Sequence, residues 1–163
     1  MRTYKLVILL ACAASCLAEV DLNGKWVEDS GKRSNLNAFL SAAGVNFFTR
    51  TAISVVSFKN EQLISQDANR YTIDGKKGPR SDPYFYTLVA DGDTNTVVDM
   101  GILGGPMDTI SFVKGNALET RVLKNGELMF ISARVRTGPN TMVHSVEHVG
   151  SRKKTTSFYN KVG

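Results

Sequence analysis

A long series of short strand patterns constrains the fold of this chain most strongly. About ten stretches are rich in β-branched and aromatic residues or alternate between apolar and polar residues, and turn formers separate them at intervals of about 8–12 residues. Lys124-Asn125-Gly126 is the clearest hairpin turn, and Asp91-Gly92-Asp93 is a second. The pattern predicts an antiparallel sandwich or barrel. The expected strands cover Val20–Val27, Ala52–Phe58, Gln62–Gln66, Arg70–Ile73, Tyr84–Ala90, Thr94–Met100, Thr109–Lys114, Ala117–Leu123, Leu128–Arg136, Met142–Val149 and Thr155–Val162.

The segment Ser34–Ala52 has a different periodicity. Apolar residues recur at helical spacing from Leu36 to Ala43, with Ser34 or Asn35 placed to cap the helix. Gly44 is placed to end this helix in a left-handed conformation. A second short apolar segment follows and ends near Arg50. The sequence therefore predicts two short helices that must pack on the strands, because the pair is too small to bury both of its faces.

The N-terminus, residues 1–18, has the pattern of a secretory signal peptide. Arg2 and Lys5 precede an apolar run, and small residues lead up to Glu19. We therefore expect an exported protein with one domain, residues 19–163. Both cysteines, Cys12 and Cys16, lie in the signal, so the processed chain has no disulfide. A bacterial lipoprotein signal with Cys12 as the lipidated residue is the alternative.

The segment Asn35-Leu36-x-x-Phe39-Leu40-x-Ala42-x-Gly44-Val45-x-Phe47-x-x-Arg50 resembles the helical lid of the fatty-acid-binding protein family. Gly24-Lys25-Trp26 and Tyr159-Asn160-Lys161-Val162 are similar to the first and last strands of that family. The resemblance implies a mainly β fold, a ten-stranded antiparallel up-and-down β-barrel with an N-terminal helix-turn-helix lid. It also implies binding of a fatty acid, a retinoid or a related hydrophobic molecule, without a cofactor and without catalysis.

Burial of an alkyl chain contributes about 0.8 kcal/mol per CH₂, whereas an unpaired buried carboxylate is costly. The cavity therefore needs a cation or strong donors. The resemblance places Arg121 and Tyr159 at the ligand headgroup, and it places Ser157 where the family carries a second arginine. Arg134 and Arg136 share strand parity with Phe130 and Ser132, so either arginine could turn inward as a replacement. The expected portal residues are Phe39, Val45, Phe47 and Phe48.

Two further patterns in the sequence have less specific interpretations. His144-Ser-Val-Glu147-His148 matches a zinc motif by letter, but its alternation predicts a strand, which places Glu147 opposite the two histidines. The basic clusters 76–80 and 152–154 are expected in solvated loops, with transient docking on an anionic membrane as the functional interpretation.

The net charge argues against nucleic acid as a partner. It falls from +5 to +3 when residues 1–18 are removed, and no motif that pairs basic with aromatic residues accompanies it. The expected function is that of a secreted, monomeric carrier of a hydrophobic small molecule. The alternatives are a lipocalin-type binder, a structural or protective barrel without a specific ligand, and an enzyme that depends on His144.

Overall fold

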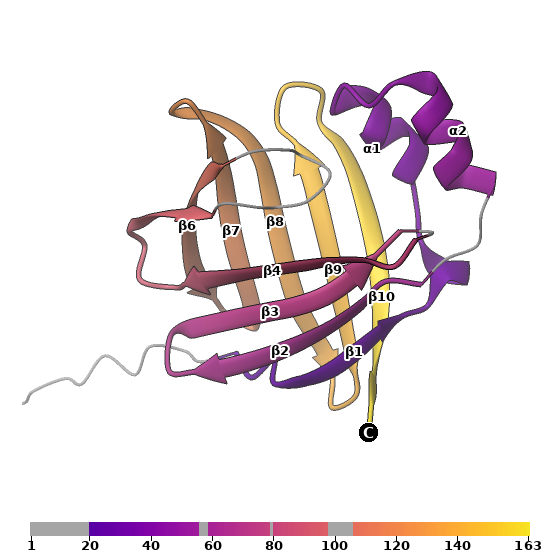
Figure 1. Cartoon of the computed structure of the whole chain (residues 1–163). Helices are drawn as coiled ribbons and strands as arrows, with labels where there is room; N and C mark the ends of the chain where they lie inside the picture. The colour runs from indigo at the N-terminus through magenta and orange to yellow at the C-terminus, as the bar shows by residue number, and fades with distance from the viewer. Residues whose placement is uncertain (1–19, 56–58, 79, 98–105) are drawn as a thin grey trace, which may run out of the picture.

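In the computed structural model, residues 20–55, 59–78, 80–97 and 106–163 are described. They form one antiparallel sheet of ten strands in the order β4-β3-β2-β1-β10-β9-β8-β7-β6-β5. The sheet curves into a nearly closed barrel, with two helices at one end (Figure 1). The strands are β1 (Gly24–Glu28), β2 (Glu61–Asp67), β3 (Arg70–Lys77), β4 (Asp82–Val89), β5 (Thr94–Val97), β6 (Met107–Lys114), β7 (Ala117–Lys124), β8 (Glu127–Gly138), β9 (Thr141–His148) and β10 (Lys153–Val162).

This topology confirms the predicted fold class, a ten-stranded up-and-down barrel with a helical lid. Each strand pairs with the next strand in the chain, except β4 with β5. In addition, β1 pairs with β10, which joins the two ends of the sheet sequence. Strands β4 and β5 are the edges of the sheet, and no ladder joins them in the described part of the chain. The eight-stranded lipocalin barrel is therefore not the architecture of this chain.

The first lid helix, α1 (Leu36–Ala42), forms as the sequence predicts. Asn35 occupies the N-cap position in a left-handed conformation, with φ of 57°, but its side chain makes no capping hydrogen bond. At the other end Gly44 has φ of 80°, and the amide of Val45 donates to the carbonyl oxygen of Leu40 at 2.9 Å. This six-residue closure is a Schellman motif, which explains why glycine is needed there.

The second lid helix, α2 (Phe47–Val55), is longer than predicted, and the expected strand Ala52–Phe58 is wrong over residues 52–55. Residues 56–58 lie outside the described part. β-branched residues favour strands only weakly, so Thr51 and Ile53 are accommodated in a helix that starts after Asn46. The Asn46 side-chain oxygen accepts the amide of Thr49 at 2.9 Å, a side-chain bond typical of a helix start. A short 3₁₀ helix, Ser30–Lys32, precedes the lid.

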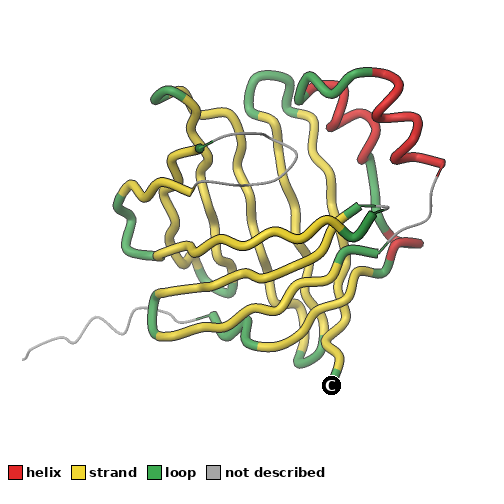
Figure 2. The backbone as a smooth tube through the Cα atoms, viewed as in Figure 1, coloured by secondary structure: helices red, strands yellow, loops and turns green. Residues whose placement is uncertain are grey.

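The lid rests on the barrel through one face of α1, and Figure 2 shows both helices at the same end of the barrel. Phe39 and Leu40 are buried in a cluster with Met107, Val122 and Phe130 of the barrel. The rings of Phe39 and Phe130 lie 5.9 Å apart. Helix α1 therefore closes one end of the barrel, which we call the lid end.

Two strands extend further than predicted. The strand expected to end at Ile73 continues to Lys77, and the strand expected to end at Arg136 continues to Gly138. Gly75 explains the first difference. A Cβ atom there would lie 2.4 Å from the Tyr84 ring of β4 and 2.6 Å from the backbone oxygen of Glu61 of β2, so glycine permits the close approach of β3 to both neighbours. The glycine-rich segment 101–105 lies outside the described residues.

A second apolar cluster fills the opposite end of the barrel. Trp26 is fully buried there with Ile64, Tyr71 and Leu88, and its indole Nε1 donates to the carbonyl oxygen of Leu22 at 2.8 Å. The large indole ring of Trp26 therefore helps to close the end of the barrel away from the lid. The inner surface thus has apolar residues at both ends.

Candidate functional site

A belt of polar side chains lies on the inner face of the barrel, between the two apolar clusters. On β8 the inward positions run from buried Phe130 at the lid end through Ser132 to Arg134. On β9 they run from buried Met142 through His144 to Val146. The polar belt consists of Gln62, Tyr86, Ser111, Thr120, Ser132, Arg134, His144, Ser157 and Tyr159.

The side chain of Arg134 is the centre of this belt. The residue is 2% exposed, Nε donates to Oε1 of Gln62 at 3.2 Å, and Nη2 donates to the hydroxyl of Tyr86 at 2.5 Å. The guanidinium carbon also lies 5.9 Å from the centre of the Tyr86 ring. Neutral oxygens therefore hold the guanidinium in place, and a cation buried in this way lacks a compensating charge.

Glu28 is the one buried acidic residue in the described part of the chain, and its carboxylate has a different partner. Arg33 Nε donates to Oε1 of Glu28 at 2.6 Å, and Arg33 Nη2 donates to Oε2. The backbone amide of Asn60 also donates to that carboxylate, at 3.2 Å. The negative charge of Glu28 is thus neutralised by Arg33, so Arg134 forms no ion pair with an acidic side chain of the described residues.

Two tyrosines beside the belt are held in the neutral, proton-donating form. Burial raises the pKa of the Tyr159 hydroxyl above its ordinary value of 10.0, and the nearby Glu28 carboxylate raises it further. Burial also raises the pKa of Tyr84, whose ring stacks on that of Tyr86 at 5.9 Å. Tyr159 is thus buried at an inward position, near enough to Arg134 for that cation to oppose the rise in its pKa.

His144 extends the belt across the next strand. It lies opposite Arg134 in the β8–β9 ladder and opposite Ser157 in the β9–β10 ladder. Its Nε2 is 2.9 Å from the Ser132 hydroxyl. Burial, with a smaller contribution from the Arg134 cation, lowers the pKa of His144 well below its ordinary value of 6.5. The imidazole is therefore neutral at pH 7.

Several inward side chains of the belt are only half-buried, although strands surround them. Tyr86, His144, Val146 and Ser157 all retain accessible surface. An inward side chain in a filled core has almost none, as Trp26 shows. These inward side chains are therefore not packed on all sides, in contrast to Trp26.

The structure does not place Arg121 in this site, and the predicted position deep in the cavity is wrong. The Arg121 side chain is 50% exposed on the outer face of β7, with Nε 4.0 Å from Oε1 of Glu119. Its guanidinium lies 5.2 Å from the centre of the Phe112 ring. Side chains alternate across a strand, and the inward positions of β7 are the buried Thr120 and Val122. Arg134 supplies the inward guanidinium instead.

The other predicted site residues divide into two groups. Phe39, Phe130 and Val45 belong to the cluster under the lid, and Phe39 and Phe130 are fully buried there. Phe47 and Phe48 are 65% and 84% exposed at the start of α2, so they do not line the inner surface. Their rings contact each other at 5.9 Å, and the Arg50 guanidinium lies 6.0 Å from the centre of the Phe47 ring.

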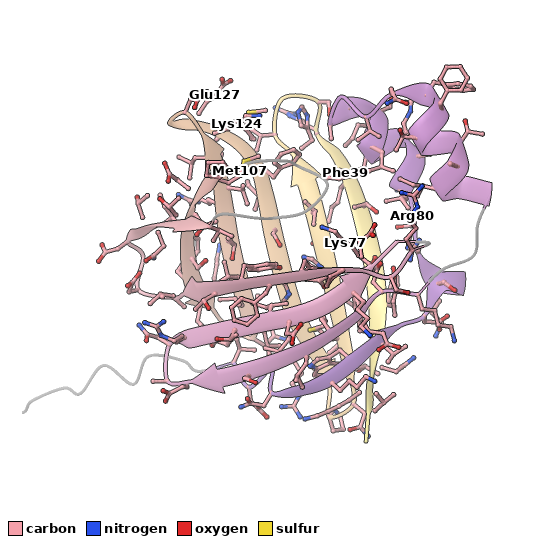
Figure 3. The ribbon with its side chains drawn as sticks, in the orientation of Figure 1. Phe39, Lys77, Arg80, Met107, Lys124 and Glu127 are labelled. Atoms are coloured by element: carbon pink, nitrogen blue, oxygen red, sulfur yellow. The ribbon has the colours of Figure 1, made fainter. Side chains whose placement is uncertain are left out.

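Basic residues surround the lid end. Arg80, which precedes β4, and the turn 149–152 both lie at this end, because alternate hairpins of an up-and-down sheet return to the same side. Lys77 and Arg80 lie below the lid helices in Figure 3, and Lys124 lies at the same end on the β7–β8 turn. The Lys77 ammonium lies 5.1 Å from the centre of the Tyr84 ring.

The zinc motif does not form a metal site. Residues 144–148 lie on strand β9, as predicted, and His148 makes its hydrogen bonds with Ser151 in the turn that follows. Within the residues that the structure describes, no group of three histidine, cysteine, aspartate or glutamate side chains could hold a metal ion.

The described helices are not long and apolar enough to span a membrane.

A shallow hollow lies at the end of the barrel away from the lid, between the first described residues and the β6–β7 and β8–β9 turns. Arg136 occupies it: Nη1 donates to a carboxylate oxygen of Asp21 at 2.5 Å, and Nη2 donates to the carbonyl oxygen of Pro139 at 3.0 Å. Arg136 therefore ties the start of the domain to the β8–β9 turn and does not enter the polar belt.

Comparison by sequence gives no matching family model and no significantly similar curated protein. Comparison of the structure does give matches. The "REP1-NXSQ fatty acid transporter" superimposes with a TM-score of 0.70 at 19% identity, over 89% of this chain and 98% of that chain. The chain has the fold of the fatty-acid-binding proteins. "Human cRBP IV" gives a TM-score of 0.71 at 16% identity, over 88% of this chain and all of that chain. Fatty-acid-binding protein 1 of Echinococcus granulosus gives 0.69 at 14% identity, over 87% and 98%.

Proposed function

We propose that this protein binds a hydrophobic molecule with an anionic headgroup, such as a fatty acid, inside the barrel. The observation that carries the proposal is the buried Arg134 guanidinium, which neutral partners hold in place and no acidic side chain of the described residues neutralises. A bound carboxylate would supply the missing charge and could accept two hydrogen bonds from one guanidinium. Tyr159, with its proton retained, is a further donor beside the same position.

The surroundings of Arg134 support an amphipathic ligand. The polar belt is flanked by the two apolar clusters, so a headgroup at Arg134 leaves an alkyl chain next to apolar side chains, where each buried CH₂ contributes about 0.8 kcal/mol. The names of the structural neighbours describe carriers of fatty acids and a retinol-binding protein, which supports a carrier without catalysis.

The proposal is tested by calorimetric titration of the delipidated protein with oleate and with oleyl alcohol. Arg134→Gln is expected to weaken oleate binding about ten- to a hundredfold, since hydrogen bonds to charged groups contribute about 1.5–3 kcal/mol. Binding of the alcohol is expected to change little. Arg121→Gln is the matched control, because it removes an arginine from the outer face of the adjacent strand, and it is expected to leave both affinities unchanged.

Other outcomes distinguish the rival functions. Tighter binding of the alcohol or of retinol than of oleate, with no loss in Arg134→Gln, would favour a neutral ligand. That possibility rests on Ser157, which stands where the resemblance expects a second arginine. No binding of any of these molecules would favour a structural or protective barrel. Extraction of lipid from protein purified from its source then identifies the natural ligand.

We also propose that the carrier is a secreted monomer that exchanges its ligand at anionic membranes. The signal-like pattern of residues 1–18 supports export, although it lies outside the described residues. The lid end supports membrane contact, because it combines the exposed Phe47 and Phe48 with Arg80 and the basic turn 152–154. Each basic residue near an anionic surface contributes about 1 kcal/mol. Secretion is tested by N-terminal sequencing of the protein recovered from culture medium.

A further inference from the structure

We infer that His144 is a second, proton-dependent anion ligand of the barrel interior, so that binding of an anionic headgroup at Arg134 is accompanied by uptake of one proton at His144. This inference rests on the proposed function, and it names the residue that makes the affinity for anions depend on pH. It concerns one row of side chains across three neighbouring strands, Arg134, His144 and Ser157.

The position of the imidazole relative to Arg134 is fixed by the sheet. His144 is the direct ladder partner of Arg134, and both residues are at inward positions. The Ser132 hydroxyl holds Nε2 at 2.9 Å, which fixes the orientation of the ring. Within the described residues Nδ1 has no hydrogen-bond partner, and the residue is only half-buried. Nδ1 is therefore available to a ligand atom.

The other groups of the interior provide no negative charge for a protonated His144. The neighbour of His144 on β8 is the Arg134 cation. Its neighbour on β10 is Ser157, and Tyr159 follows two residues later. The titratable groups at inward positions of β4 are Tyr84 and Tyr86. The one buried carboxylate, Glu28 on β1, is paired with Arg33. On β9 itself, His148 makes its hydrogen bonds in the turn with Ser151, and Glu147 lies at an outward position. In the empty barrel protonation of His144 therefore places two cations side by side.

A bound anion reverses this balance. Its charge compensates Arg134 and attracts a proton to the adjacent imidazole, which becomes a second donor to the headgroup. By linkage, the affinity for an anion rises as the pH falls through the pKa of His144 in the complex, and it becomes constant below the pKa of the empty protein. The affinity for an uncharged ligand has no such dependence.

The test uses 1-anilinonaphthalene-8-sulfonate, whose sulfonate stays ionised throughout, and uncharged N-phenyl-1-naphthylamine. Binding of each probe is measured by fluorescence between pH 8 and pH 5, with circular dichroism as the check that the protein is folded at each pH. The sulfonate is expected to bind at least about tenfold more tightly at the acidic end, which corresponds to a difference of one pKa unit. The uncharged probe is expected to bind equally at all pH values.

The chain offers a matched control, because it contains only two histidines, His144 and His148, and both lie at inward positions of β9. His144→Gln is expected to remove the pH dependence of sulfonate binding, whereas His148→Gln is expected to retain it. Proton NMR of the His148→Gln variant, which has a single histidine, is expected to show the His144 pKa rising when the sulfonate is added.

The outcomes separate this inference from the proposed function. The role of His144 is overturned if sulfonate binding depends on Arg134 but is constant with pH. It is also overturned if the His144→Gln variant keeps the pH dependence. Both outcomes leave the proposed function intact. Sulfonate and oleate binding that are both unaffected by Arg134→Gln overturn the proposed function itself.

Discussion

Arg134 and His144 are direct partners in the β8–β9 ladder, and both side chains face the inside of the barrel. No buried carboxylate of the described residues is available to them, since Glu28 is paired with Arg33. An interior that concentrates basic groups in this way is unfavourable for the empty protein. The same arrangement is favourable when an anion is present, so stability and binding are expected to respond in opposite directions to changes at Arg134.

Arg134→Gln is accordingly expected to leave the melting temperature of the delipidated protein unchanged or to raise it. Removal of the uncompensated cation offsets the loss of the hydrogen bonds to Gln62 and Tyr86. The increase in melting temperature that oleate produces in the wild type is expected to be smaller in the variant at the same oleate concentration, because the variant binds oleate more weakly. Differential scanning calorimetry with and without oleate measures both quantities. A variant that is less stable when empty but still stabilised by oleate would contradict the prediction.

The fold could be predicted from the sequence because local signals agreed with each other. Gly44, the Asn125-Gly126 turn and the alternation within the strands each require the conformation that the structure shows. The inward-facing arginine was harder to predict. Arg121 is four residues from the turn, but only the alternation of Thr120 and Val122 shows that it faces outward. The same parity argument, applied to Phe130 and Ser132, is the signal that identifies Arg134.

Two features had no usable sequence signal. The pairing of Arg134 with His144 depends on the register between β8 and β9, which is set by an irregularity between Arg136 and Gly138. The ion pair between Glu28 and Arg33 depends on the short 3₁₀ helix, which reverses the chain so that Arg33 lies next to the end of β1. Both are tertiary relationships, so residue patterns alone do not contain them.

Glu28→Gln is expected to destabilise the protein by about 3–5 kcal/mol, because it leaves the nearly buried Arg33 guanidinium without its carboxylate. Equilibrium unfolding in urea measures this change. Glu61→Gln is the control on the neighbouring strand. Glu61 forms an ion pair with Lys25 at 3.3 Å in which both side chains are about half exposed, and such pairs contribute about 1 kcal/mol or less. Equal losses in the two variants would show that burial of the Glu28 pair is not what makes it important.

The buried tyrosines are expected to make the fold sensitive to alkali. Burial raises the pKa of Tyr84 and of Tyr159 above the ordinary value of 10.0. The unfolded chain therefore loses these protons first, and the stability that the neutral hydroxyls provide is complete below pH 10 and falls as the pH rises above 10. In the double variant Tyr84→Phe/Tyr159→Phe, the free energy of unfolding is expected to fall less steeply above pH 10 than in the wild type. If the free energy of unfolding falls equally steeply with pH in the two proteins, the alkali sensitivity does not come from Tyr84 and Tyr159.

The exposed tip of the lid is expected to serve ligand exchange and not stability. Phe47→Ser combined with Phe48→Ser removes two rings that are 65% and 84% exposed, so the free energy of unfolding is expected to change by less than about 0.5 kcal/mol. Transfer of a fluorescent fatty acid to vesicles that contain phosphatidylserine is expected to slow several-fold. Phe85→Ser is the control, since Phe85 is 63% exposed on the outer face of β4. Transfer at the wild-type rate in the lid variant would exclude the tip from membrane contact.

The lowered pKa of His144 also makes a prediction for the empty protein in acid. Burial keeps the native imidazole neutral, whereas the unfolded chain takes up a proton near the ordinary value of 6.5. The stability that depends on His144 is therefore fully present above pH 6.5 and falls as the pH falls below 6.5, with a slope of up to about 1.4 kcal/mol per pH unit for one proton. His144→Gln is expected to remove this component from urea unfolding curves measured between pH 7 and pH 5, and His148→Gln is expected to retain it. A bound sulfonate ligand is expected to flatten the wild-type curve, because the complex then takes up the proton as the unfolded chain does. A curve that falls equally in the His144→Gln variant would assign the acid sensitivity to carboxylates and not to this imidazole.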